Sequence, residues 1–175
     1  MVIKSKRTNL IHIKKEKAWE KQRAVVERIT DGLGRRVDNG IKECVIALRM
    51  YGFPTSASCE GHLASHTPWV EIYAPEPQGR AKKKEKEHMW RRENLKERKR
   101  MLEILKEFYQ RRKVPLDTML YLERLGIFGG FIIQSMGAET IEMFPREKRK
   151  KKIREYRKEM DDFTRFLRDK FFREN

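Results

Sequence analysis

Basic side chains are concentrated in three blocks of this chain, and two near-neutral segments separate the blocks. Residues 1–28, 80–113 and 146–175 carry nine, fifteen and thirteen basic side chains against three, six and seven acidic ones. Residues 29–79 and 114–145 carry four and one basic side chains against six and four acidic ones, within a total net charge of +16. A buried sheet tolerates few charges. We therefore expect the basic blocks to form helices with a solvated face and the near-neutral segments to form strands.

Apolar residues within the basic blocks recur at helical spacing. In the C-terminal block, the apolar residues at 153, 156, 160, 163, 167 and 171 follow steps of three or four, which puts them on one helix face. Residues 14–29 and 102–109 show shorter stripes of the same kind. Residues 80–100 contain few large apolar side chains, so this part is predicted to be a charged helical extension or a mobile arm.

The near-neutral segments predict one helix and four strands. Asp38 is a good helix N-cap, and Gly52 followed by Pro54 ends the helix that Asp38 begins. Residues 53–58, 69–73, 118–124 and 128–135 have the character of strands, and Gly126 marks a tight turn between the last two. The predicted fold class is α+β: a small, mostly antiparallel sheet of about four strands, covered by basic amphipathic helices, in a single domain over residues 1–175.

Composition also bears on the class of protein. The longest apolar stretch, residues 125–133, is far shorter than the roughly 20 residues of a membrane helix, and no apolar leader follows the N-terminal methionine. The chain has two cysteines, Cys44 and Cys59, which is too few for a disulfide framework. We therefore expect no membrane partner and a reducing, cytoplasmic location. Cys44 falls on an apolar helix face and is predicted to be core.

Reactive side chains are dense between residues 55 and 71. One thiol, two imidazoles and two carboxylates lie there, on a chain with only two cysteines and four histidines. Three chemical interpretations are open. In the first, Cys59, His62 and His66 bind a metal ion, with zinc the natural cofactor for thiolate and imidazole ligands. In the second, Cys59 is a catalytic nucleophile and His62 is its base, oriented by Glu60 or Glu71.

In the third interpretation, hydroxyl and backbone N–H groups of the same segment bind an anion or a small ligand. The side chains involved would be Thr55, Ser56, Ser58 and Glu71, and the strand-end residues Gln134 and Ser135 could line the same site. A purely structural interpretation also stands. Cys59 would then be a small buried apolar residue, His62 a hydrogen-bonded turn residue and His66 a solvated one.

The second basic block predicts contacts to nucleic acid. Clusters of Lys and Arg bind phosphate backbones by releasing counterions, and no zinc finger, aromatic RNA-binding pair or helix-turn-helix pattern is present, so the binding would not depend on base sequence. The residues expected to make these contacts are Lys82, Lys83, Lys84, Arg91, Arg92, Arg98, Lys99 and Arg100. A phosphate-binding pocket at Cys59 itself would require a basic helix to fold over the near-neutral turn.

Residues 55–62, which read Thr-Ser-Ala-Ser-Cys-Glu-Gly-His, resemble a bacterial family without an assigned activity that carries a Ser-Cys-Glu-Gly-His signature. The Phe-Gly-Gly-Phe run at 128–131 and Gln134-Ser135 are similar to that family as well. A more local similarity exists to the wybutosine-synthesis tRNA methyltransferase family, in which only Ser58, Cys59 and Gly61 match, while Glu60 and His62 replace a serine and an arginine. This resemblance implies a shared local fold and not a shared substrate.

Two functional hypotheses follow. The first is a nucleic-acid-associated protein, with RNA favoured, that holds a small Cys/His/Glu ligand or metal site and could be an enzyme. The second is a non-catalytic basic binding or scaffold protein in which the 55–71 turn is purely structural.

Overall fold

The near-neutral segments form the predicted sheet, and the basic blocks form helices around it. The computed structural model describes residues 2–31, 33–62, 66–80 and 82–174. In chain order the elements are α1 Val2–Val26, α2 Asn39–Met50, β1 Thr55–Cys59, β2 Trp69–Ile72, α3 Lys83–Tyr109, the short helix η1 Leu116–Thr118, β3 Leu120–Leu125, β4 Gly130–Ser135, the short helix η2 Ala138–Met143 and α4 Arg146–Arg173. The α+β class is confirmed.

The four strands pair in the order β1-β2-β4-β3, and every pairing is antiparallel. Alternate residues of a strand point to opposite faces of a sheet. On one face, Val70, Ile72, Phe131 and Ile133 are fully buried and join the main core. On the other face Trp69, Glu71 and Ile132 are half-buried, and Gln134, the partner of Trp69, is a buried polar residue. The helical layer therefore packs on one face of the sheet, with β1 at its edge.

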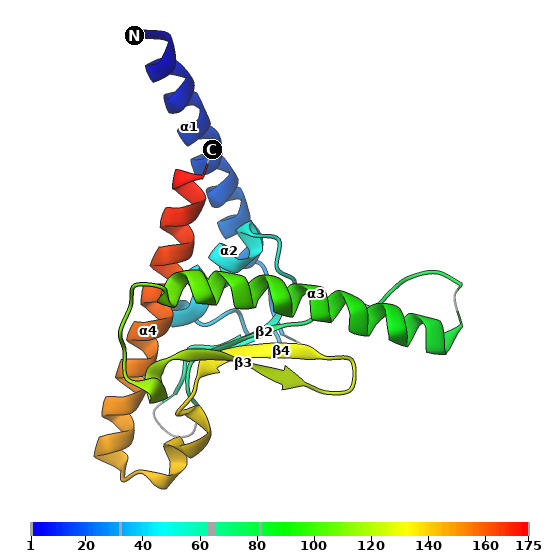
Figure 1. Ribbon diagram of the computed structural model, residues 1–175, viewed down its shortest axis with the longest axis vertical. Coiled ribbons are helices and arrows are strands. Elements are labelled where there is room, and N and C mark those ends of the chain that lie inside the picture. Colours follow the sequence, from blue (N-terminus) through cyan, green and yellow to red (C-terminus); the bar gives the residue numbers. More distant parts are fainter. Residues whose placement is uncertain (1, 32, 63–65, 81, 175) are drawn as a thin grey trace.

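Figure 1 shows how the helices are arranged on that face. α3 runs across the sheet, and α4 runs beside the C-terminal half of α1, whose N-terminal turns extend beyond the body of the protein. The pairing of α1 with α4 is aromatic, since the ring of Trp19 lies 5.7 Å from the rings of both Phe171 and Phe172. The predicted apolar face of α4 is confirmed, because Ile153, Tyr156, Met160, Phe163 and Leu167 are at most 1 % exposed. Cys44 is buried in the same core, 3.6 Å from the sulfur of Met160.

Residues 83–100 are helical and continuous with the rest of α3. Two side chains fasten this half to the sheet. Trp90 stacks on Phe128 of the β3–β4 turn, with 4.4 Å between ring centroids. The fully buried amide of Asn94 accepts from the Ala74 N–H at 2.8 Å and donates to the Phe128 carbonyl at 3.2 Å.

The boundaries of several elements differ from those predicted, for local reasons. α1 begins at Val2 rather than near residue 14, and it ends at Val26. β3 begins at Leu120 because η1 occupies residues 116–118 after Pro115. β4 begins at Gly130 because Gly129 has φ +77° and belongs to the turn. At Gly130 itself an added Cβ would clash with the Tyr73 ring, so the strand backbone approaches this ring too closely for any other residue.

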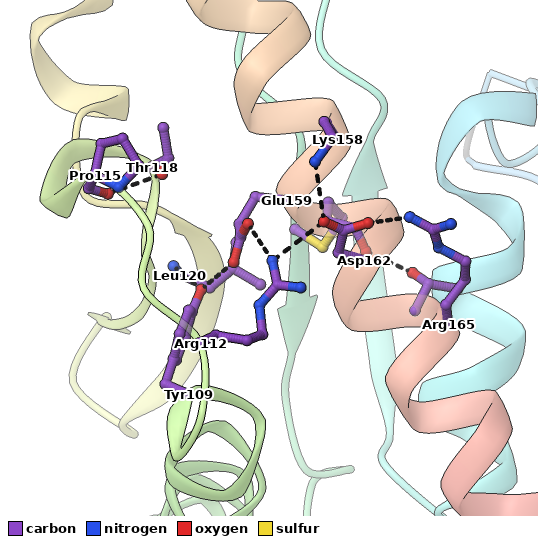
Figure 2. A network of polar contacts seen from close by, with 11 residues as sticks. Tyr109, Arg112, Pro115, Thr118, Leu120, Lys158, Glu159, Asp162 and Arg165 are labelled. Carbon is purple, nitrogen blue, oxygen red and sulfur yellow. Dashed lines mark hydrogen bonds and ion pairs between the residues drawn. The ribbon is translucent and has the colours of Figure 1, made fainter.

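A buried polar network joins the end of α3 to α4 (Figure 2). The Arg112 guanidinium donates to Glu159 at 2.8 Å and to Asp162 at 3.1 Å, and both carboxylates are nearly buried. Tyr109 donates to Glu159 at 2.8 Å and accepts the Leu120 N–H at 2.8 Å, which ties β3 to the same network. Buried charges are tolerated when they are paired and hydrogen-bonded in this way.

No helix among the described residues is long and apolar enough to cross a membrane.

Candidate functional site

The segment that follows β1 is held in place from both sides. Gly61 has φ +82°, and a Cβ there would lie 2.8 Å from the Pro68 nitrogen and 3.0 Å from the His66 carbonyl oxygen. Only glycine fits this turn without strain. From the other side the Arg157 guanidinium of α4 donates to the carbonyl oxygens of Glu60, at 3.0 Å, and of Gly61. Arg157 lies 97 residues from Glu60, and sequence reasoning did not find this contact.

The Glu60 carboxylate has a structural partner. Its Oε2 atom accepts the Gly40 N–H at 2.7 Å, in the first turn of α2. The N–H groups there have no partner within the helix, and the helix dipole favours a negative charge. Glu60 therefore caps α2 from outside. Asp38 stands at the N-cap position, as predicted, but its side chain makes no capping hydrogen bond.

The Asp38 carboxylate turns instead towards the end of β1. Its Oδ2 atom accepts the Glu60 N–H at 3.3 Å and lies 3.5 Å from Nε2 of His62. Cys59 Sγ accepts the Gly61 N–H at 3.3 Å. One ligand atom from each of Asp38, Cys59 and His62 lies within 4.8 Å of the others. This cluster, which we call the Asp-Cys-His triad, differs from the predicted set in that Asp38 takes the place of His66.

The environment of Cys59 bears on its reactivity. Burial raises the pKa of the Cys59 thiol; the Gly61 N–H partly offsets this, while the negative charges of Asp38 and Glu60 add to it. A thiolate is the reactive form of cysteine, and a raised pKa keeps the group protonated near neutral pH. The nearby Arg157 guanidinium lowers the pKa of Cys59, but this is the smallest of these effects.

Two cavities meet at His62. The first, about 320 Å³, lies between β1 and the loop before α2, and its lining includes the predicted ligand-binding hydroxyls of Thr55, Ser56 and Ser58 together with Arg35 and Arg36. The segment between α1 and α2 also contributes to this cavity. The Asp31 carboxylate accepts the Leu33 and Arg35 N–H groups at 2.8 Å, and Asp31 itself lines the cavity.

The second cavity, about 440 Å³, is lined by His62 and by four residues of α4: Lys150, Ile153, Arg154 and Arg157. The basic helix that a phosphate pocket at this turn would require is therefore present. Its cationic side chains line the same cavity as His62, although the strands and turns that build the site are near-neutral in sequence.

The remaining predicted ligand-binding residues lie elsewhere on the sheet. Glu71 accepts the Ser56 hydroxyl at 2.7 Å across the β1–β2 pair. Gln134 lies two strands away from Cys59, beyond Trp69, and its amide donates to Tyr121 and Glu123. Ser135 is fully buried. Among the described residues, Gln134 and Ser135 line neither of the cavities at His62.

The predicted nucleic-acid-binding side chains are spread around α3. Lys82, Lys83, Lys84, Arg91, Arg92 and Lys99 are exposed, and Arg98 is half-buried. Arg100 is exposed but is held against the body of the protein: its guanidinium lies 3.9 Å from the centre of the Phe53 ring and donates to the Tyr51 carbonyl at 3.0 Å.

Comparison with family models, curated proteins and solved structures gave no significant match. The similarity to the Ser-Cys-Glu-Gly-His family and to the tRNA methyltransferase family thus stays a prediction from the sequence, and the function is argued from the geometry alone.

Proposed function

We propose that this protein binds the phosphate backbone of RNA and that α3 is its main contact surface for RNA. The observation that carries the proposal is the separation of charge around α3. Steps of four and three residues from the start of the helix trace one line along its surface, which we call the basic stripe: Lys84, His88, Arg91, Leu95, Arg98, Leu102 and Lys106. Residues at this spacing share a helix face.

None of these seven residues is acidic. Glu93 and Glu97 lie away from the stripe, whereas Glu87, three residues after Lys84 and four before Arg91, and Glu103, three residues before Lys106, border it. Within the described part of the chain, Lys84, Arg91 and Arg98 form no ion pair. Lys106, at the end of the stripe, pairs with Glu103 at 2.8 Å, and off the stripe Lys96 pairs with Glu93 at 2.8 Å and Arg100 with Glu97 at 2.9 Å. Unneutralised cations in a row are what a polyanion binds by counterion release.

The geometry of the basic stripe suits an extended strand. Lys84, Arg91 and Arg98 are seven residues apart, so their Cα atoms follow one another at about 10.5 Å along the axis. Leu95 lies between Arg91 and Arg98, and Leu102 lies between Arg98 and Lys106; their side chains are 40 % and 44 % exposed. An exposed apolar side chain between cations gives an unstacked base something to pack on, and single-stranded RNA offers such bases.

The cations of α4 at His62 extend the proposal to the turn after β1. Lys150, Arg154 and Arg157 present three positive charges to one cavity, where a phosphate or nucleotide would be bound beside the Asp-Cys-His triad. This would connect the basic helices to the site that the sequence singles out.

The test is a binding titration of labelled single-stranded RNA by fluorescence anisotropy. The stripe variant carries Lys84→Gln, Arg91→Gln and Arg98→Gln. The matched control carries Lys14→Gln, Lys17→Gln and Lys21→Gln on α1, which removes the same charge from three exposed positions. We expect the stripe variant to bind about tenfold more weakly or worse, because three lost contacts of roughly 0.5–1 kcal/mol each add up to that factor.

The control should lose much less affinity. Equal losses in the two triple variants would mean that RNA responds only to net charge, and an unchanged affinity in the stripe variant would refute the role of α3.

A second candidate function is a non-catalytic scaffold, and the partners of the turn favour it. Glu60 caps α2, and Arg157 donates hydrogen bonds to two carbonyl oxygens of the turn, so both side chains stabilise the local fold. In a scaffold, Leu95 and Leu102 would pack against a partner protein. Wild-type protein that binds no RNA at low salt would make this second function the better account.

A further inference from the structure

The Asp-Cys-His triad offers three different ligand types at one point, and they come from three separate places in the fold. Asp38 precedes α2, Cys59 ends β1, and His62 follows the turn at Gly61. Their ligand atoms lie within 4.8 Å of one another, and the carboxylate and imidazole atoms are 3.5 Å apart. We propose that Asp38, Cys59 and His62 bind a zinc ion through Oδ, Sγ and a ring nitrogen, with a fourth position left open. This inference does not depend on RNA binding.

The distances suit a single small ion. Zinc binds thiolate sulfur at about 2.3 Å and imidazole nitrogen or carboxylate oxygen at about 2.0–2.2 Å, so two ligand atoms of a tetrahedral site are about 3.4–3.7 Å apart. The Asp38 and His62 atoms, 3.5 Å apart, already have this spacing, and the other ligand atoms, within 4.8 Å of one another, must approach by up to about 1 Å. The His62 side chain is 56 % exposed and is free to rotate towards the ion.

Other residues already orient two of the three ligands. The Gly61 N–H donates to Cys59 Sγ and the Glu60 N–H donates to Asp38 Oδ2, each at 3.3 Å. Such contacts aim ligands and support their charge in metal sites. The backbone that supplies them is fixed by Arg157 on the Glu60 and Gly61 carbonyls and by Glu60 on α2. In this proposal, Glu60 and Arg157 position the backbone that orients the metal ligands.

The charges balance as well. One carboxylate and one thiolate carry two negative charges, which offset the two positive charges of the ion. Binding would release the thiol proton of Cys59, because a coordinating thiol is deprotonated. An ion at His62 would adjoin both cavities, since His62 lines each of them. The open position would then lie near Lys150 and Arg154, which suits an anionic ligand.

The test is cobalt(II) titration of metal-free wild-type protein. Cobalt replaces zinc in tetrahedral sites and gives a sulfur-to-metal charge-transfer absorption only when a thiolate is bound. We expect one equivalent of cobalt to produce this absorption and one equivalent of zinc to abolish it. Cys44, the other cysteine, is 2 % exposed in the core and is not available to produce the signal.

The variants Asp38→Asn, Cys59→Ser and His62→Ala should each weaken binding by at least about tenfold, since even partners outside the ligand set are worth 10–100-fold. His66→Ala, in the same turn, is the control and should bind like wild type. Circular dichroism shows which variants fold. If a variant does not fold, the charge-transfer absorption of the wild-type protein alone tests whether Cys59 binds the metal ion. Absence of the thiolate signal in folded wild-type protein would overturn the proposal, as would loss of binding in His66→Ala with retention in Asp38→Asn.

Discussion

At the scale of single residues, the turn after β1 depends on positions where side chains and backbone meet very closely. Gly61 is the clearest case, because it has both a left-handed φ and no space for a Cβ. Gly34 has a similar φ of +77° but nothing within 4 Å of an added Cβ. Alanine substitutions at these two glycines therefore distinguish the cost of a left-handed φ from the cost of a steric clash.

We predict that Gly34→Ala lowers the free energy of unfolding by about 1–2 kcal/mol, the cost of a left-handed conformation. Gly61→Ala should cost at least about 1 kcal/mol more, because the added methyl group also displaces the Pro68 backbone. Urea unfolding of both variants measures the difference. Equal costs would mean that the Pro68 contact relaxes freely and that the turn is not rigid.

Residue-level roles were the hardest part to predict from the sequence. The thiol of Cys59 and the imidazole of His62 were identified from residue type alone. Asp38 was assigned as a helix cap because an Asp before an apolar helical pattern usually is one. Its actual contacts to residues 60 and 62 depend on how β1 returns beside α2, which no local pattern encodes.

At the scale of elements, the apolar faces of helices and the alternation along strands were the sequence features that predicted most of the fold. The apolar stripe of α4 predicted its buried face correctly because burial repeats every three or four residues along the whole helix. The first half of α3 was ambiguous because its main anchors are single residues, Trp90 and Asn94. A lone amide such as Asn94 gives no periodic signal, and its partners, Ala74 and Phe128, belong to the β2–α3 and β3–β4 connections.

The network between α3 and α4 leads to a prediction about pH. Burial raises the pKa of the Asp162 carboxyl, but hydrogen bonds from Arg112, Arg165 and Lys158 outweigh it, so the pKa lies below the ordinary value of 3.8. A lowered pKa contributes stability that is present above the unfolded-state pKa and is lost as the pH falls through the folded-state pKa.

Asp162→Asn should therefore be less stable than wild type at pH 7, by about 1–3 kcal/mol, and the gap should shrink below about pH 4. The matched control is Asp169→Asn, an exposed position on the same helix that should change stability by less than about 0.5 kcal/mol at either pH. Guanidinium unfolding at pH 7 and pH 3 measures both. A gap between Asp162→Asn and wild type that is constant with pH would contradict the lowered pKa.

At the scale of the whole molecule, the tertiary structure brings cationic side chains of α4 next to the reactive side chains of the turn after β1. In the sequence, the basic blocks and the residues from 55 to 71 are separate, and the near-neutral character of the turn argues against a phosphate site there. Folding brings Lys150, Arg154 and Arg157 to His62. The net charges of the sequence blocks predicted which elements carry the cationic side chains. Finding the face on which each cationic side chain lies required the geometry of the folded helices.

The central claim is that the phosphate backbone of RNA binds to the basic stripe, and the salt dependence of binding tests it most directly. For a single strand, log affinity falls linearly with log salt concentration with a slope near −0.7 per phosphate contact. We predict a steep linear fall for wild-type protein, and a slope shallower by about 2 for the Lys84→Gln, Arg91→Gln, Arg98→Gln variant, which loses three contacts. A flat response in wild type, or the same slope in both proteins, would contradict the account.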